Sequence, residues 1–131
     1  MKVVPVVDRL YRVDLGMVNA YILDEKELTL IDSGIPGSAE KILEALGHLG
    51  RSSEDLKHII LTHLHMDHTG RAAELKARTG ATVHMHRLDA GMLAEGRAAR
   101  EMNPAPGILS KLVTKLLISR APTKVDACET D

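Results

Sequence analysis

The sequence predicts a single α/β domain over residues 1–131, and three observations support this prediction. Short runs rich in Val, Ile and Leu fill the first third of the chain, as expected for strands. Helical and strand patterns then alternate, which is typical of parallel strands with helices packed on the sheet. A cluster of His and Asp residues directly follows one apolar strand, and α/β folds often place their chemistry in such a loop.

Four strands are predicted before the first helix, at residues 3–7, 10–13, 18–23 and 27–31. Residues 24–26 (Asp-Glu-Lys) have the composition of a hairpin connection between the last two. Residues 32–34 (Asp-Ser-Gly) end the fourth strand. Residues 36–38 (Pro-Gly-Ser) are typical of a helix N-terminus, so a helix is expected to start there.

Helices and strands alternate from this point onward. The first helix ends at Gly50 and carries an apolar stripe made of Ile42, Leu43, Ala45, Leu46 and Leu49. A strand is predicted at residues 56–62, a helix at 70–79 that Gly80 ends, and a strand at 81–85. Two further helices are predicted at residues 88–100 and 108–119. The last helix is amphipathic and basic, so it fits packing on protein or, as an alternative, lying on a membrane.

Residues 63–68 read His-Leu-His-Met-Asp-His and begin where the strand at 56–62 ends. Side chains at i and i+2 of an extended segment face the same way, so His63 and His65 can converge on one ion. Asp67 continues the alternation, and His68 lies beside it as the chain turns into its helix. Such a ligand set is expected of a two-metal site, with ions about 3.5–4 Å apart. The alternative is a solvated loop that is rich in His by chance.

Imidazole and carboxylate ligands favour zinc, as one or two ions, with iron or manganese as alternatives. Zinc is therefore the predicted cofactor.

Composition argues against several other functions. The 17 basic and 18 acidic residues leave a formal net charge of −1, which gives no electrostatic reason to expect a nucleic-acid polymer. Tyr11 and Tyr21 are the only aromatic residues, so no set of rings is available for base stacking. No apolar run is long enough for a signal peptide or a membrane span, so we expect a cytoplasmic protein without a membrane partner. Cys128 is the single cysteine, which excludes a disulfide within the chain.

Three segments resemble signatures of the metallo-β-lactamase-fold hydrolases: residues 18–23, residues 29–34 and, most specifically, residues 60–70. The resemblance covers nearly the whole chain. It implies that the chain forms the N-terminal, ββα-type half of a four-layer αββα sandwich. It also assigns His63 and His65 to a first metal, and Asp67 and His68 to a second.

The same resemblance implies a reaction. A metal-bound hydroxide would be the nucleophile, because a bound metal lowers the pKa of water to about 7. Asp67 would help to orient that hydroxide and is the predicted catalytic residue. Asp32 would lie behind the site and form a hydrogen bond to a ligand, although an Asp before Gly34 is equally expected as a turn residue.

Members of the family are generally longer than this chain, so the domain is expected to be incomplete. Their third histidine of the first site, bridging acid and last histidine come later, and no histidine follows His86 here. His84 and His86 share a strand face and could substitute, but ordinary surface histidines are the simpler interpretation. His48 and His58 receive no role. Half a sandwich would expose an apolar sheet face, so we expect a homo-oligomer or a missing C-terminal half to cover it.

The predicted function is zinc-dependent hydrolysis of a small-molecule ester, thioester, lactone, amide or phosphodiester, with a glyoxalase-II or lactonase type favoured. Three alternatives stay open. The chain could be a non-catalytic metal-binding or assembly module, a truncated and inactive fragment of such a hydrolase, or an iron redox enzyme on the same scaffold.

Overall fold

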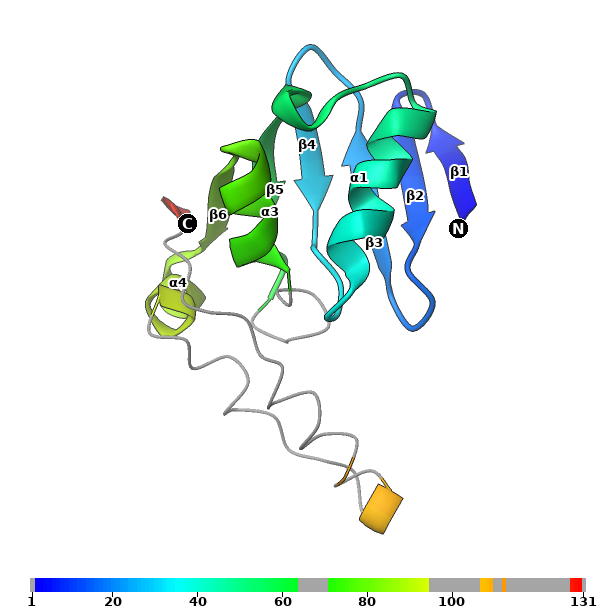
Figure 1. Ribbon diagram of the computed structural model, residues 1–131. Helices are drawn as coiled ribbons and strands as arrows, with labels where there is room; N and C mark the ends of the chain where they lie inside the picture. The colour runs from blue at the N-terminus through cyan, green and yellow to red at the C-terminus, as the bar shows by residue number, and fades with distance from the viewer. Residues whose placement is uncertain (1, 64–70, 95–106, 110–111, 113–127, 131) are drawn as a thin grey trace.

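The computed structural model describes residues 2–63, 71–94, 107–109, 112 and 128–130. Its central feature is one sheet whose seven described strands lie in the order of the sequence (Figure 1). These strands are β1 (Lys2–Val7), β2 (Leu10–Asp14), β3 (Asn19–Leu23), β4 (Leu28–Ile31), β5 (Leu56–Ile60), β6 (Thr82–His86) and β7 (Cys128–Thr130). Strands β1 to β4 pair antiparallel, and strands β4 to β7 pair parallel.

The change from antiparallel to parallel pairing follows from the connections. Short turns join each of the strands β1 to β4 to the next one, because antiparallel neighbours need only a few connecting residues. Parallel neighbours need a crossover: α1 (Ser38–His48) and the 3-10 turn η1 (Ser53–Asp55) lie between β4 and β5, and α3 (Ala72–Thr79) lies between β5 and β6. The carboxyl ends of β4, β5 and β6 therefore meet at one edge of the sheet, which is the edge where the histidine run begins.

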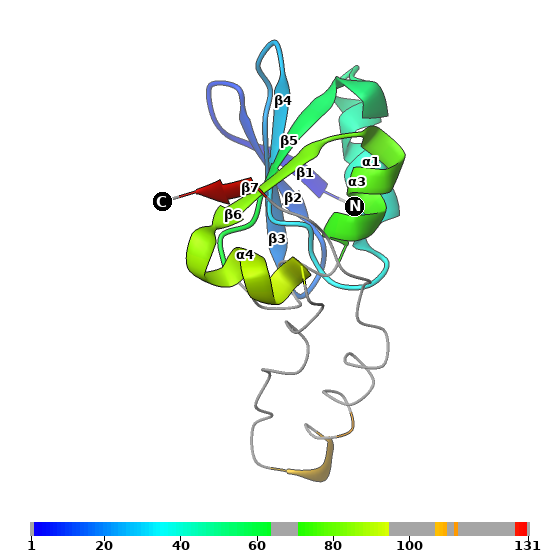
Figure 2. The same cartoon turned by 90° about the vertical axis from the view of Figure 1, so that its left-hand side faces the viewer.

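Helices α1 and α3 cover the same face of the sheet, as the side view shows (Figure 2). Alternate strand residues point toward these two helices, and the core lies between the helices and the sheet. Its largest fully buried side chains are Ile22, Leu28, Leu30, Ile42, Leu46, Leu56, Ile59, Leu75, Met85, Val13 and Val83. Arg78 of α3 forms an ion pair with Glu40 of α1, so the two helices are also joined at their exposed surface.

The opposite face of the sheet carries a mixed set of partly exposed side chains. Tyr21, Ile31, Ile60 and His84 follow one another across β3 to β6 in register, and Ile60 is 41% exposed. Neither α1 nor α3 lies on this face (Figure 2). Helix α4 (Arg87–Ala94) contacts β6 and β7 at the lower end of the sheet in Figure 2.

The predicted α/β class is confirmed, and the predicted elements from β1 to β6 are all present. The hairpin at residues 24–26 joins β3 to β4 as expected. Gly80 ends α3 in the left-handed conformation, with a φ of 73°, as a C-terminal glycine should. No helix among the described residues is long and apolar enough to cross a membrane.

Several boundaries differ from the prediction. The strand expected over residues 56–62 ends at Ile60, and the helix expected from residue 70 starts at Ala72. Helix α1 starts at Ser38, within the predicted residues 36–38, with Gly37 as its N-cap and Ser38 buried in the first turn. Strand β7 was not predicted, since three residues are too short to show an alternating pattern.

The two predicted C-terminal helices are described only in part. Helix α4 starts at Arg87 and is described as far as Ala94, and the remainder of the predicted range 88–100 lies outside the described residues. Of the helix predicted at 108–119, Ile108, Leu109 and Leu112 are helical and exposed.

Candidate metal centre

The histidine run starts three residues after the end of β5, at the carboxyl edge of the sheet. His63 is described, whereas His65, Asp67 and His68 lie outside the described residues. No group of three or more His, Cys, Asp or Glu residues that could hold a metal is found in the described part of the chain, which holds only the first of the four predicted ligands. The ligand assignment of His63, His65, Asp67 and His68 therefore stays a prediction. What the structure adds is how the two ends of this loop are held.

Asp32 is the first residue after β4 and faces the start of the loop. Its amide donates a hydrogen bond of 2.8 Å to the carbonyl of Ile60, which extends the pairing of β4 with β5 by one step. Its φ of 63° then turns the chain away from the sheet, a left-handed conformation that Asp adopts more readily than most residues. Asp32 is only 6% exposed, so its carboxylate is held inside the protein and must find donors there.

Thr62 supplies those donors. Its amide lies 2.9 Å from Asp32 Oδ1, and its hydroxyl lies 2.8 Å from Asp32 Oδ2. Both hydrogen bonds join the end of β4 to the residue just before His63. The turn and ligand-supporting interpretations of Asp32 are thus compatible, because one residue turns the backbone and also anchors the loop.

The Thr62 hydroxyl also lies 2.9 Å from Nδ1 of His63, which decides where the ring carries its proton. A carboxylate can only accept, so the single hydroxyl proton of Thr62 points to Asp32. The Thr62 oxygen then accepts a hydrogen bond from Nδ1–H of His63. In the neutral ring Nε2 consequently carries the lone pair, which is the arrangement that metal-binding histidines show. The donor set at His63 therefore fits zinc, and Asp32 is linked to the ring through the Thr62 hydroxyl.

Ser33 holds the other end of the loop. The backbone amide of Arg71, the first described residue after the gap, donates a hydrogen bond of 3.2 Å to Ser33 Oγ. Ser33 is fully buried, so this contact forms in the interior next to the core. Two consecutive residues, Asp32 and Ser33, thus hold the chain on both sides of the predicted ligands.

Gly34 completes this support by allowing close packing. A Cβ atom at this position would lie 2.5 Å from Ser38 Oγ and 2.6 Å from Leu15 Cδ1, which is too close for any side chain. Its φ of 73° also favours glycine. The Asp-Ser-Gly sequence therefore has three separate structural roles: an anchor for Thr62, an acceptor for Arg71, and a close approach to α1.

His84 and His86 were considered as substitute ligands, and their rings have other partners. Nε2 of His84 lies 3.0 Å from Nδ1 of His58, and Nδ1 of His86 accepts a hydrogen bond of 3.2 Å from the Leu88 amide. Burial, together with the nearby His58, lowers the pKa of His84.

The sequence did not predict a role at the site for Thr62, Ser33 or His58. Of these three residues, Thr62 alone has a signal in the sequence, because it directly precedes the predicted ligand His63.

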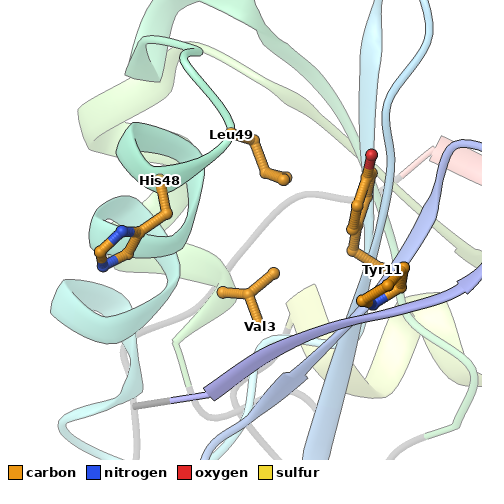
Figure 3. Close-up of a pocket in the computed structure, with 5 residues that line it drawn as sticks. Val3, Tyr11, His48 and Leu49 are labelled. Atoms are coloured by element: carbon orange, nitrogen blue, oxygen red, sulfur yellow. The ribbon is translucent and has the colours of Figure 1, made fainter.

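A groove of about 280 Å³ lies elsewhere, between the edge strand β1, its neighbour β2 and the end of α1. It is lined by Val3, Pro5, Tyr11, His48 and Leu49. Val3 and Leu49 face Tyr11 across the hollow, while the His48 ring points away from them (Figure 3). This groove adjoins the opposite end of α1 from Ser38, and none of the anchoring residues lines it. We assign it no part in the metal centre.

Comparison with known proteins identifies the family. The sequence model described as the metallo-β-lactamase superfamily matches residues 13–127. The chain belongs to this superfamily. Its sheet and helices correspond to the N-terminal half of the metallo-β-lactamase fold, as the sequence predicted.

Individual relatives cover only part of each protein. A hydroxyacylglutathione hydrolase of Albidiferax ferrireducens is 47% identical over 60 residues, which are 46% of this chain and 21% of that protein. The hydroxyacylglutathione hydrolase GloC of Haemophilus influenzae is 38% identical over 60 residues, or 46% of this chain and 26% of that one. A subclass B3 metallo-β-lactamase of Bradyrhizobium japonicum superposes with a TM-score of 0.68 at 32% identity, covering 73% of this chain and 37% of that structure. The chain thus spans well under half the length of these relatives.

Proposed function

We propose that this chain carries the N-terminal ligands of a zinc-dependent hydrolase that cleaves thioesters of the hydroxyacylglutathione type. The observation that carries the proposal is the hydrogen-bonded series Asp32–Thr62–His63, because it engages Nδ1 of His63 and so makes Nε2 the nitrogen that would bind a metal. Membership of the superfamily and the partial match to two hydroxyacylglutathione hydrolases support the hydrolase class.

In this proposal His63 and His65 hold one ion, and Asp67 and His68 hold a second. Zinc, when bound, would supply a Lewis acid that lowers the pKa of a coordinated water, so that water can attack a carbonyl carbon near neutral pH. Asp67 would orient the attacking water by accepting a hydrogen bond from it. Asp32 and Thr62 would keep the His63 ring in one orientation during turnover, and Ser33 would hold the far end of the loop through Arg71.

The proposal is tested by measuring zinc content and hydrolysis together. The zinc-loaded chain is assayed against a 2-hydroxyacyl glutathione thioester, a simple aryl ester, a lactone and a chromogenic cephalosporin. We expect the thioester to be cleaved with the highest kcat/KM. The β-lactam belongs in the panel because the superposed structures include metallo-β-lactamases.

Variants of the predicted ligands identify the site responsible. His63→Ala and Asp67→Ala should each lower kcat/KM by at least about 100-fold, since losing a direct ligand should cost at least as much as losing its supporting partner. His48→Ala is the matched control, because His48 is exposed at the end of α1. Bound zinc without turnover would contradict hydrolysis by this chain and would favour a non-catalytic metal-binding module or an inactive fragment of a hydrolase. Turnover that His63→Ala leaves intact would rule out this site.

A further inference from the structure

A second group of titratable side chains lies outside the histidine run, on the sheet face that α1 and α3 leave uncovered. His58 is in the middle of β5 and His84 is in the middle of β6. In the parallel register His58 is paired with Thr82, and His84 is paired with Ile60. The two histidines are therefore diagonal neighbours on one face of adjacent strands. Glu27, directly before β4, reaches the same place from the next strand.

The three side chains form a continuous series. Nδ1 of His58 lies 3.0 Å from Nε2 of His84, and Nε2 of His58 lies 3.1 Å from Oε2 of Glu27. The two rings are 5.2 Å apart between their centres and tilted by 45°. The Glu27 carboxylate therefore contacts Nε2 of His58, and the His84 ring contacts Nδ1 of His58.

The positions of the protons follow from this geometry. Glu27 can only accept, so Nε2 of His58 carries a hydrogen and, in the neutral ring, Nδ1 carries a lone pair. Nε2–H of His84 donates to that lone pair. In the other neutral tautomer of His84 the hydrogen lies on Nδ1 instead of Nε2, and two nitrogen lone pairs then face each other across this short gap. Such a pair is a bidentate ligand that holds a proton in the absence of metal.

We propose that His58 and His84 form a second transition-metal site, in which one ion takes the place of the hydrogen between their rings, His84 carries its own hydrogen on Nδ1, and Glu27 orients His58. Zinc–nitrogen bonds of about 2.0–2.1 Å at a tetrahedral angle place two ligand nitrogens about 3.3 Å apart. The nitrogens need to separate by only a few tenths of an ångström from their 3.0 Å spacing. The site is expected to bind divalent ions that prefer imidazole ligands, and zinc is the ion used to test it.

The surroundings fit an open site. Strands β5 and β6 hold the two rings on a rigid part of the fold, which is the placement that gives a metal site its precision. The His58 side chain is 38% exposed, so solvent can complete the coordination. A carboxylate on the far nitrogen of a ligating histidine is the usual second partner and raises the basicity of the ring.

This site is separate from the predicted loop ligands. His58 lies in the middle of β5, whereas His63 follows the end of that strand by three residues and contacts Thr62. His58 contacts Glu27 and His84, and neither of these residues is among the predicted loop ligands. The inference therefore does not depend on the proposed hydrolase activity, and it can be tested when the loop ligands are removed.

The test uses the 131-residue chain with His63, His65, Asp67 and His68 all replaced by Ala, so that Zn²⁺ has no ligands in the loop. Zinc is titrated by calorimetry, and the ring nitrogens are followed by ¹⁵N NMR. We expect one saturable ion per chain, with the largest shifts at Nδ1 of His58 and Nε2 of His84.

Single substitutions in this background identify the ligands. His58→Gln and His84→Gln should each abolish saturable binding, and Glu27→Gln should weaken it by about 10-fold. His86→Gln is the matched control, because His86 lies two residues from His84 on the same strand and contacts Leu88 instead. The exposed Glu27 provides a second test if His84→Gln fails to fold. Absence of saturable zinc binding in the loop variant, or binding that His58→Gln leaves unchanged, would overturn the proposal.

Discussion

The carboxylate of Asp32 accepts two hydrogen bonds from Thr62, one from its amide at 2.9 Å and one from its hydroxyl at 2.8 Å. This pairing joins the end of β4 to the residue that precedes the histidine run. It also determines the proton arrangement of His63, because the hydroxyl proton is already committed to the carboxylate. A buried acid thus acts on the predicted metal centre through one hydroxyl group.

Thr62→Val should weaken zinc binding in the loop by about 10- to 100-fold, the usual cost of losing a partner behind a ligating histidine. Valine keeps the shape of threonine but removes the group that accepts from Nδ1–H of His63. The free energy of unfolding should also fall by about 1 kcal/mol, because the Asp32 carboxylate loses a donor. Zinc affinity is measured by chelator competition and stability by urea unfolding.

The control for this prediction is Thr62→Ser, which retains the hydroxyl and should keep the native affinity. If Thr62→Val and Thr62→Ser bind zinc equally well, Thr62 does not orient His63. If Thr62→Ser loses as much affinity as Thr62→Val, the hydroxyl alone does not account for the effect of Thr62.

The sequence predicts the parts of this structure that depend on local chemistry. Gly80 could be placed at the end of a helix because a left-handed terminus favours glycine. His63 is predicted as a ligand from residue type and spacing, whereas the place of Asp32 behind the site follows from the resemblance to the family. The contact between His58 and His84 could not be found this way, because it depends on the register of two strands 26 residues apart.

Gly34→Ala should lower the free energy of unfolding by about 2–5 kcal/mol. About 1–2 kcal/mol comes from the left-handed backbone and about 1–3 kcal/mol from overpacking. The added methyl group would overlap the side chains of Ser38 and Leu15. Gly37→Ala is a matched control, since Gly37 has a φ of 94° but no atom near its absent Cβ. Urea unfolding that gives equal losses for the two variants would contradict the packing argument.

Asp55 should make the stability of the chain depend on pH in the acid range. Its carboxylate accepts hydrogen bonds from the Ser52 amide at 2.8 Å and the Ser52 hydroxyl at 3.2 Å. The Ser52 amide contributes most to lowering the pKa of Asp55 below its ordinary value of 3.8, and Arg51 adds to it. Because the folded pKa is the lower one, this stabilisation is present above pH 3.8 and is lost as the pH falls through the folded value.

The measurement for Asp55 is urea unfolding at a series of pH values from about 6 to about 2. Asp55→Asn should flatten the acid limb of the stability profile, because the substituted residue no longer titrates. Glu54→Gln, at the exposed neighbouring position, serves as the control. An acid limb as steep in Asp55→Asn as in the native chain would contradict the assignment.

Ser33→Ala should release the far end of the loop without unfolding the helix that follows it. The Arg71 amide loses its acceptor, so its hydrogen exchange should accelerate by about 10-fold, corresponding to about 1.4 kcal/mol for one hydrogen bond. The Leu75 amide provides an internal control, because it donates to the Arg71 carbonyl within α3 and should keep its protection. Equal acceleration at Arg71 and Leu75 would mean that Ser33 stabilises the whole helix and not the loop end. Unchanged exchange at both would remove Ser33 from the support of the metal centre.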